Sequence, residues 1–120
     1  MKEKDLEHLR LMLDFAKRVE RRILGISIDE FLKNEDLQDM TLYAIGQVGE
    51  NASAISDITK DKHPEVFWGA VVGIRNRVFH SYGAVDMSIV YEAAADHMPV
   101  LVKQITNIIN AITKNKLDSI

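Results

Sequence analysis

The chain contains no cysteine, which excludes disulfides and thiolate metal sites, and nothing in its composition indicates an oxidising compartment. Helix-breaking residues are also scarce, with two prolines and six glycines among 120 residues. No apolar run approaches the roughly twenty residues that a membrane-spanning helix needs, and residues 1–5 do not lead into a signal sequence. We therefore expect residues 1–120 to form a single domain, cytoplasmic and without membrane association.

Excess charge of either sign is lacking too, because 15 Lys and Arg against 18 Asp and Glu give a net charge of −3. Non-specific nucleic-acid binding depends on many contacts from Lys and Arg to phosphates, so this balance argues against a broad binding surface of that kind. A local cluster of cations remains at residues 17–22. We interpret it as a solvated helix end whose cations complement the helix dipole, and expect any RNA contact on a restricted face.

Apolar residues recur at steps of three and four along most of the chain, the period of an amphipathic helix, and no β-type alternation is present. The pattern predicts an all-α domain, an antiparallel four-helix bundle with one additional short helix. The long helices are expected at residues 5–24, 35–58 and 64–82, and from 86 to about 114. The short helix is expected directly after Ser27.

Local signals predict where these helices begin. Ser27 and Glu30 are spaced as a capping box, and Asn34 and Asp86 are expected N-caps. Pro64 suits the first position of the fourth helix, because its missing N–H would have no partner there.

Three further features concern the packing of the helices. Gly46 and Gly49 weaken the third helix, so we expect them to let another helix approach closely. The fourth helix is apolar around much of its circumference, with Trp68 expected in the core. Pro99 is expected to bend the last helix without ending it, and His97 to face inward on that helix.

The fourth helix ends in Arg75-Asn76, His80 and Tyr82, which have the form Arg-x4-His-x-Tyr. A histidine titrates near neutral pH and an arginine offers planar donors for a phosphate, a pairing that suits RNA cleavage without a metal. In this hypothesis His80 is the general base on a ribose 2′-hydroxyl and Arg75 stabilises the transition-state charge. Asn76 would hold His80 or a phosphate oxygen.

Glu50 is a possible supporting residue that positions Arg75 or His80, and the alternative is that it simply faces solvent. The other histidines show no spacing typical of metal ligands, such as His-x3-His, and no glycine-rich phosphate loop is present. We therefore expect neither a metal nor another cofactor.

Helix geometry separates the motif into two rows, because on an ideal helix Asn76 and His80 lie about 100° round from Arg75 and Tyr82. Two arrangements would bring the rows to one phosphate. The helix loosens near Ser81, or a second copy of the same helix completes the site across a two-fold axis.

The motif, together with residues 73–80 and 84–86 around it, resembles that of the HepT-like toxins, a branch of the HEPN superfamily. The resemblance implies a dimeric, metal-independent ribonuclease with Arg75 and His80 as catalytic residues. It also implies a toxin–antitoxin pair in which a minimal nucleotidyltransferase antitoxin adenylylates Tyr82. The alternative is a non-catalytic HEPN dimer that serves as a binding module for a nucleotidyltransferase or a nucleotide.

Overall fold

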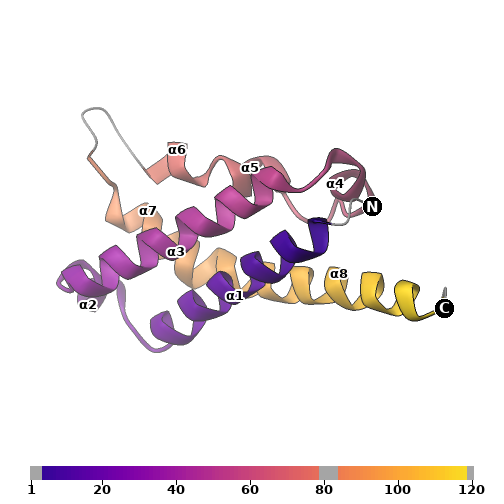
Figure 1. The fold of residues 1–120 in the computed structure, drawn as a ribbon. Coiled ribbons are helices and arrows are strands. Elements are labelled where there is room, and N and C mark those ends of the chain that lie inside the picture. Colours follow the sequence, from indigo (N-terminus) through magenta and orange to yellow (C-terminus); the bar gives the residue numbers. More distant parts are fainter. Residues whose placement is uncertain (1–3, 79–83, 119–120) are drawn as a thin grey trace.

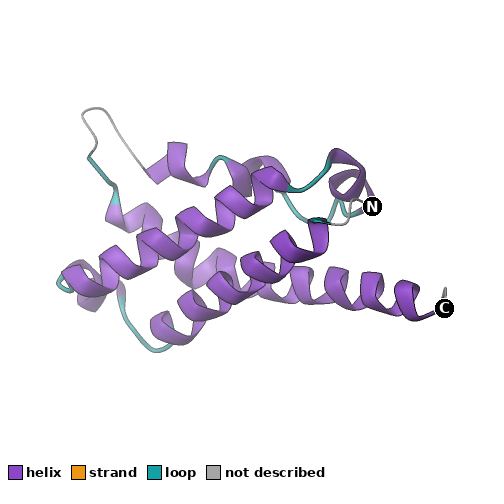
Figure 2. Ribbon diagram, in the orientation of Figure 1, coloured by secondary structure: helices purple, strands orange, loops and turns teal. Residues whose placement is uncertain are grey.

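The computed structural model describes residues 4–78 and 84–118, and these residues form helices joined by short connections (Figures 1 and 2). Within them no strand occurs, so the predicted all-α class is confirmed. In chain order the elements are α1 (Asp5–Ile23), α2 (Ile28–Leu32), α3 (Glu35–Ala54), α4 (Asp57–Lys62), α5 (Trp68–Val72), α6 (Ile74–Val78), α7 (Met87–Glu92), the π-helical segment η2 (Ala93–His97) and α8 (Met98–Asp118).

The core lies between α1, α3 and α8, with α1 packed against both of the others (Figure 1). Their inward stripes follow the three- and four-residue spacing of the sequence, as a helix with one apolar face requires. The largest fully buried side chains on these three helices are Leu9, Met12, Val19, Ile45, Val48, Ile105 and Ile108. Apart from Ile45, these residues lie on the stripes that the sequence predicted, whereas Ile58, which was expected on the inward face of the third helix, lies beyond the end of α3 and is 55% exposed.

Most of the predicted helix starts are confirmed by their hydrogen bonds. The Glu30 N–H donates to the Ser27 hydroxyl at 3.2 Å, which is the N-cap half of the predicted capping box, and that hydroxyl donates to the Glu30 carboxylate. The Asn34 side chain accepts from the first turn of α3. The Asp86 carboxylate accepts from the backbone N–H groups of Ser88 and Ile89 at the start of α7.

The third helix is shorter than predicted, ending at Ala54 rather than near residue 58. The reason is a buried carboxylate, that of Asp5, which is only 2% exposed. It accepts from the Ser56 N–H at 3.0 Å and from the Thr59 hydroxyl at 2.6 Å. These bonds hold Ser56 in an extended conformation, so the chain leaves α3 and starts α4 at Asp57.

The prediction of one long fourth helix beginning at Pro64 is also wrong. A turn follows His63, whose carbonyl accepts from the Trp68 indole at 3.0 Å, and α5 begins only at Trp68. Trp68 lies in the core, as predicted, whereas the preceding Phe67 is 80% exposed. A second break at Gly73 separates α5 from α6.

The close helix approach predicted at the third helix occurs at Gly49 but not at Gly46. A Cβ atom on Gly49 would lie 3.1 Å from the Val71 carbonyl oxygen and 3.2 Å from the Ile74 side chain. A Cβ atom on Gly46 would meet nothing within 4 Å. Gly49 therefore permits α5 and α6 to pack on α3, whereas Gly46 opens toward solvent.

The last helical run continues past Pro99, as predicted, but changes its pitch just before it. Residues Ala93–His97 form a π-helical segment and α8 continues to Asp118. Proline has no backbone N–H to donate to the helix, and the wider π-helical turn lies just before it in the chain. The same turn changes the rotational register, so His97 is 54% exposed and near Glu92 rather than buried as predicted.

None of the helices in the described ranges is long and apolar enough to cross a membrane.

The two glycines of α3 allow a matched test of the close approach. We expect Gly46→Ala to raise the free energy of unfolding by about 0.5–1 kcal/mol, because alanine favours a helix and its methyl group has room. The same substitution at Gly49 should be less stable than Gly46→Ala by about 1 kcal/mol or more, since its methyl group contacts α5. Chemical denaturation of both variants measures the difference. An equal increase in the free energy of unfolding for both variants would contradict the close approach of α5 to Gly49.

Candidate active site

Helix α6 presents the first half of the predicted motif to solvent. Its buried residues Ile74 and Val78 are one turn apart and hold the helix on the core. Arg75 and Asn76 lie between them and are exposed. The apolar pair therefore fixes the helix and leaves the polar residues of the motif accessible to a ligand.

Glu50 on α3 lies next to Arg75 on α6. The Arg75 guanidinium Nη1 is 3.5 Å from Glu50 Oε1, and the two side chains are 57% and 60% exposed. An ion pair with this exposure adds little to stability, roughly 0–1 kcal/mol. Its local effect is to place a carboxylate beside the guanidinium, and the expectation that Glu50 positions Arg75 or His80 stays a prediction.

The second half of the motif, His80 and Tyr82, lies outside the described residues, as do Phe79, Ser81 and Gly83. The Asp86 N–H donates to the Val78 carbonyl at 2.8 Å, which joins the end of α6 to the start of α7. The split of the motif into two rows stays a prediction.

A groove of about 250 Å³ runs between α3 and α6 and includes both Glu50 and Arg75. Its floor is apolar and its rim is polar. The lining residues are Leu42, Tyr43, Ile45, Gly46, Gln47, Glu50, Ile74, Arg75 and Val78. Sequence reasoning singled out Glu50 and Arg75 but missed Tyr43 and Gln47, although their spacing from Glu50 at seven and three residues places them on the same helix face.

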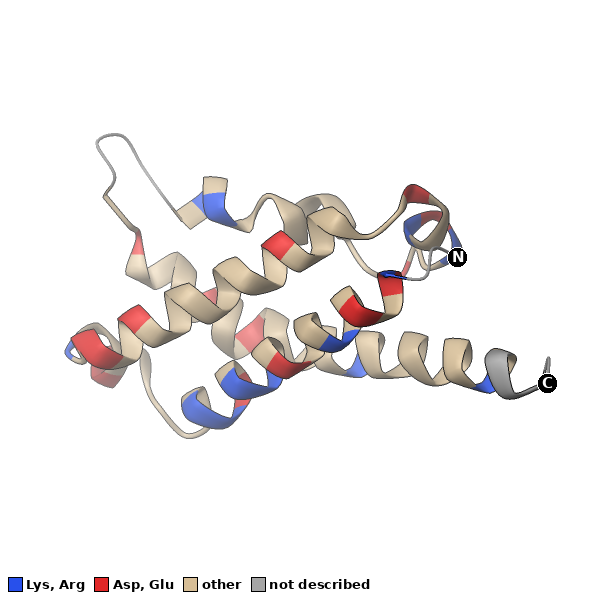
Figure 3. Ribbon diagram, in the orientation of Figure 1, with Lys and Arg blue, Asp and Glu red and all other residues tan. Residues whose placement is uncertain are grey.

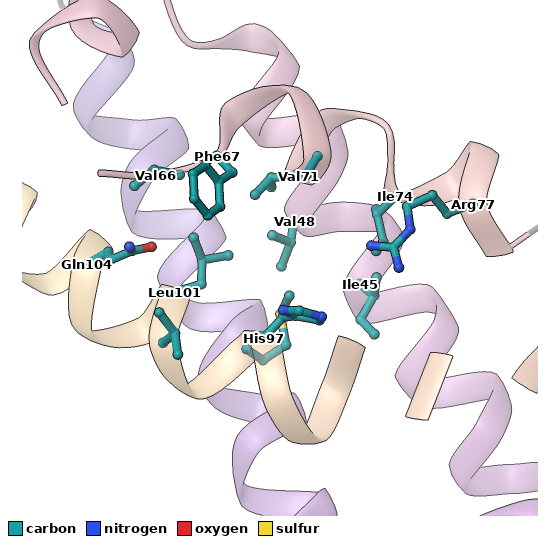
Figure 4. A pocket seen from close by; sticks show the side chains of 13 residues that line it. Ile45, Val48, Val66, Phe67, Val71, Ile74, Arg77, His97, Leu101 and Gln104 are labelled. Atoms are coloured by element: carbon teal, nitrogen blue, oxygen red, sulfur yellow. The ribbon is translucent and has the colours of Figure 1, made fainter. Parts of the chain in front are cut away.

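A second cavity, of about 210 Å³, lies between α3, α5 and the η2–α8 segment. Figure 4 shows apolar side chains of these elements pointing toward one another, with the nitrogen atoms of Arg77 and His97 on one side. The exposed Phe67 and Val100 also line it. We did not predict this cavity from the sequence. The one feature of the sequence that pointed to an apolar surface here was the predicted fourth helix, which is apolar around much of its circumference.

Charged residues are unevenly placed on the surface (Figure 3). Lys17, Arg18, Arg21 and Arg22 are all exposed near the end of α1, as the interpretation of a solvated helix end predicts. Arg18 pairs with Asp14 at 2.8 Å and lies 5.0 Å from the centre of the Phe15 ring. Within residues 4–78 and 84–118, no three His, Asp or Glu side chains are grouped so that they could hold a metal ion.

Comparison with known proteins agrees with the resemblance seen in the sequence. The family model described as "Ribonuclease HepT-like" matches residues 12–108. No solved structure matches the chain at a significant level.

Three relatives align over most of their own length. "Putative RNase TTE0752" of Caldanaerobacter subterraneus is 28% identical over 104 residues, which are 87% of this chain and 90% of that protein. "Putative RNase MJ0127" of Methanocaldococcus jannaschii is 24% identical and covers 96% of this chain and 89% of its own. "Probable ribonuclease HepT" of Thermococcus cleftensis is 24% identical, with 84% and 92% covered. Because the family match spans most of the residues and includes both Glu50 and the motif, the chain belongs to the HepT-like ribonuclease family.

Proposed function

We propose that this protein is a metal-independent endoribonuclease and the toxin of a prokaryotic toxin–antitoxin pair. The observation that carries the proposal is the exposed Arg75, held beside Glu50 at the start of the Arg-x4-His-x-Tyr motif in a chain of the HepT-like family. An accessible arginine next to a groove suits a phosphate, because its planar donors match two phosphate oxygens. RNA is therefore the proposed substrate.

The proposed chemistry uses the ribose of the substrate as the nucleophile. His80 removes the proton of the 2′-hydroxyl, and the 2′-oxygen attacks the adjacent phosphorus. The bond from phosphorus to the 5′-oxygen of the next nucleotide breaks, and this oxygen takes a proton from water. Arg75 stabilises the negative charge that develops on the phosphate oxygens. Asn76 orients His80 or a phosphate oxygen. The reaction yields a 2′,3′-cyclic phosphate and a 5′-hydroxyl, and no step requires a metal ion.

A homodimer is the proposed active form, with the site at the interface. Two rows on one helix do not converge on a single phosphate, whereas two copies of the motif related by a two-fold axis can do so. Exposed apolar side chains near α5 and α8 support an interface there, since Phe67 is 80%, Val100 54% and Val72 37% exposed. A fully active monomer would contradict this arrangement.

Tyr82 is the proposed point of control by a minimal nucleotidyltransferase antitoxin. An adenylyl group transferred to the phenol adds bulk and negative charge two residues after His80. Both would oppose the entry of an RNA phosphate. The alternative function, a non-catalytic dimer that binds a nucleotidyltransferase or a nucleotide, uses the same exposed surfaces without turnover.

Arg75→Ala and His80→Ala should each lower RNA cleavage in EDTA by about 100-fold or more, because each removes a group that acts in the transition state. Arg10→Ala is the control, an exposed arginine on α1 that lines neither the groove nor the second cavity. It should retain cleavage. Initial rates with purified proteins measure the effect, and circular dichroism checks that the variants fold.

Full cleavage by His80→Ala would disprove its catalytic role. Complete absence of cleavage by the wild type, together with tight binding to a nucleotidyltransferase, would favour the binding-module alternative.

Tyr82→Phe should cleave RNA like the wild type but escape the antitoxin, because the variant has no hydroxyl to accept an adenylyl group. Co-expression with a minimal nucleotidyltransferase and intact-mass spectrometry measures modification, and growth measures toxicity. Adenylylation of Tyr82→Phe to the same extent as the wild type would show that another residue is modified.

A further inference from the structure

One face of α3 carries a stripe of residues that the core does not use. Tyr43, Gly46, Gln47 and Glu50 are spaced at three and four residues, so they share one side of the helix. The opposite side supplies buried residues such as Ala44 and Val48. The stripe forms one wall of the groove next to Arg75.

Tyr43 is a large side chain that is 62% exposed, yet its ring is held in place. It meets the Phe15 ring edge-on, with 6.1 Å between the ring centres and an angle of 77° between the planes. Phe15 is in turn covered by the Arg18 guanidinium, which pairs with Asp14. An exposed aromatic ring that is already fixed loses little conformational freedom when another flat ring stacks on it.

Gly46 keeps the middle of this wall open. Since a Cβ atom there would meet nothing within 4 Å, the glycine is not required for helix packing. It also weakens α3 by up to about 1 kcal/mol relative to alanine. Its effect in the structure is to expose the helix backbone to the groove between Tyr43 and Glu50.

We propose that this groove binds one nucleobase of the RNA substrate, next to the phosphate held by Arg75. The base stacks on Tyr43 and lies over Gly46, and the Gln47 amide, which can donate and accept hydrogen bonds, meets the polar edge of the base. The inference rests on the proposed ribonuclease function, because it places a base of the same RNA whose phosphate reaches Arg75.

The size and charge of the groove favour a base over a protein segment. At about 250 Å³ the groove is smaller than the roughly 300–1,000 Å³ of pockets that enclose drug-sized ligands, so it suits a single planar ring. Glu50 and Arg75 stand on its rim, where the guanidinium can meet the phosphate attached to the same nucleotide. An apolar floor below a polar rim matches the flat faces and polar edges of a nucleobase.

The test measures binding rather than cleavage, using a 2′-O-methyl RNA tetranucleotide that has no free 2′-hydroxyl, and the same sugar–phosphate backbone without bases. Fluorescence anisotropy gives Kd for the wild type, Tyr43→Ala and Gly46→Leu. Gly69→Leu is the matched control, because a Cβ atom at Gly69 also meets nothing within 4 Å and Gly69 lines neither the groove nor the apolar cavity.

We expect Tyr43→Ala and Gly46→Leu each to raise the Kd for the base-bearing oligonucleotide about fivefold or more. Fivefold corresponds to the weakest effect expected when the stacking of one base is lost. Binding of the base-free backbone should not change, and Gly69→Leu should bind both like the wild type. Unchanged binding by both groove variants would overturn the inference. A change in oligomeric state by sedimentation in the groove variants, with base-dependent binding retained, would also overturn it and assign the groove to a protein interface.

The binding assay also separates this inference from the proposed function. If the wild type never cleaves RNA but Tyr43→Ala and Gly46→Leu still lose base-dependent binding, the ribonuclease proposal fails and the base site stands. If RNA is cleaved with unchanged kcat/KM by both groove variants, the ribonuclease proposal stands and the base site fails.

Discussion

The contact between Gly49 of α3 and the backbone of α5 is the constraint on which the candidate site depends. The 3.1 Å from a Cβ position on Gly49 to the Val71 carbonyl is a tight contact, so a side chain at position 49 would require α5 to move away by a few tenths of an ångström. Because α6 follows α5 directly, this contact also places Arg75 beside Glu50, one residue after Gly49 on α3. A larger residue at position 49 would separate the two walls of the groove.

The helices that carry the motif are short and are held by tertiary contacts more than by their own hydrogen bonds. Helices of five residues are unstable in isolation, because nucleation fixes several residues for few hydrogen bonds. Burial of Ile74 and Val78 and the Val78–Asp86 hydrogen bond hold α6 in place. Interruption of the fourth helix at Gly73 thus leaves Arg75 on a short, well-anchored element at the edge of the core. An anchored helix backbone keeps the guanidinium beside the groove, which suits the electrostatic role that we propose for it.

Sequence reasoning succeeded where the determining contacts are local. The capping residues Ser27, Asn34 and Asp86 act within three residues of themselves, and the inward stripes of the long helices follow from periodicity alone. Predictions from the sequence failed where a residue far away in the chain determines where a helix ends. The end of α3 depends on Asp5, which is 51 residues from Ser56, and nothing near Ser56 in the chain reveals that partner.

The same distinction between local and distant contacts explains which parts of the candidate site could be predicted from the sequence. The motif and Glu50 were recognisable as residue types at particular spacings, but the groove is formed by residues of α3 and α6 that are more than twenty positions apart in the sequence, among them Tyr43, Gln47 and Arg75. Likewise, the π-helical segment before Pro99 shifts the helix register and moves His97 from the predicted interior to the surface. An ideal helical wheel does not include such a change of pitch.

The most direct test of the central claim, that a ribose 2′-hydroxyl is the nucleophile and Arg75 stabilises the phosphate, uses an RNA whose cleavage position has been mapped. A single 2′-deoxy substitution at that position, assayed in EDTA, removes only the proposed nucleophile. The account predicts that cleavage at this linkage is lost while the RNA still binds. Cleavage at the unmodified rate would contradict it.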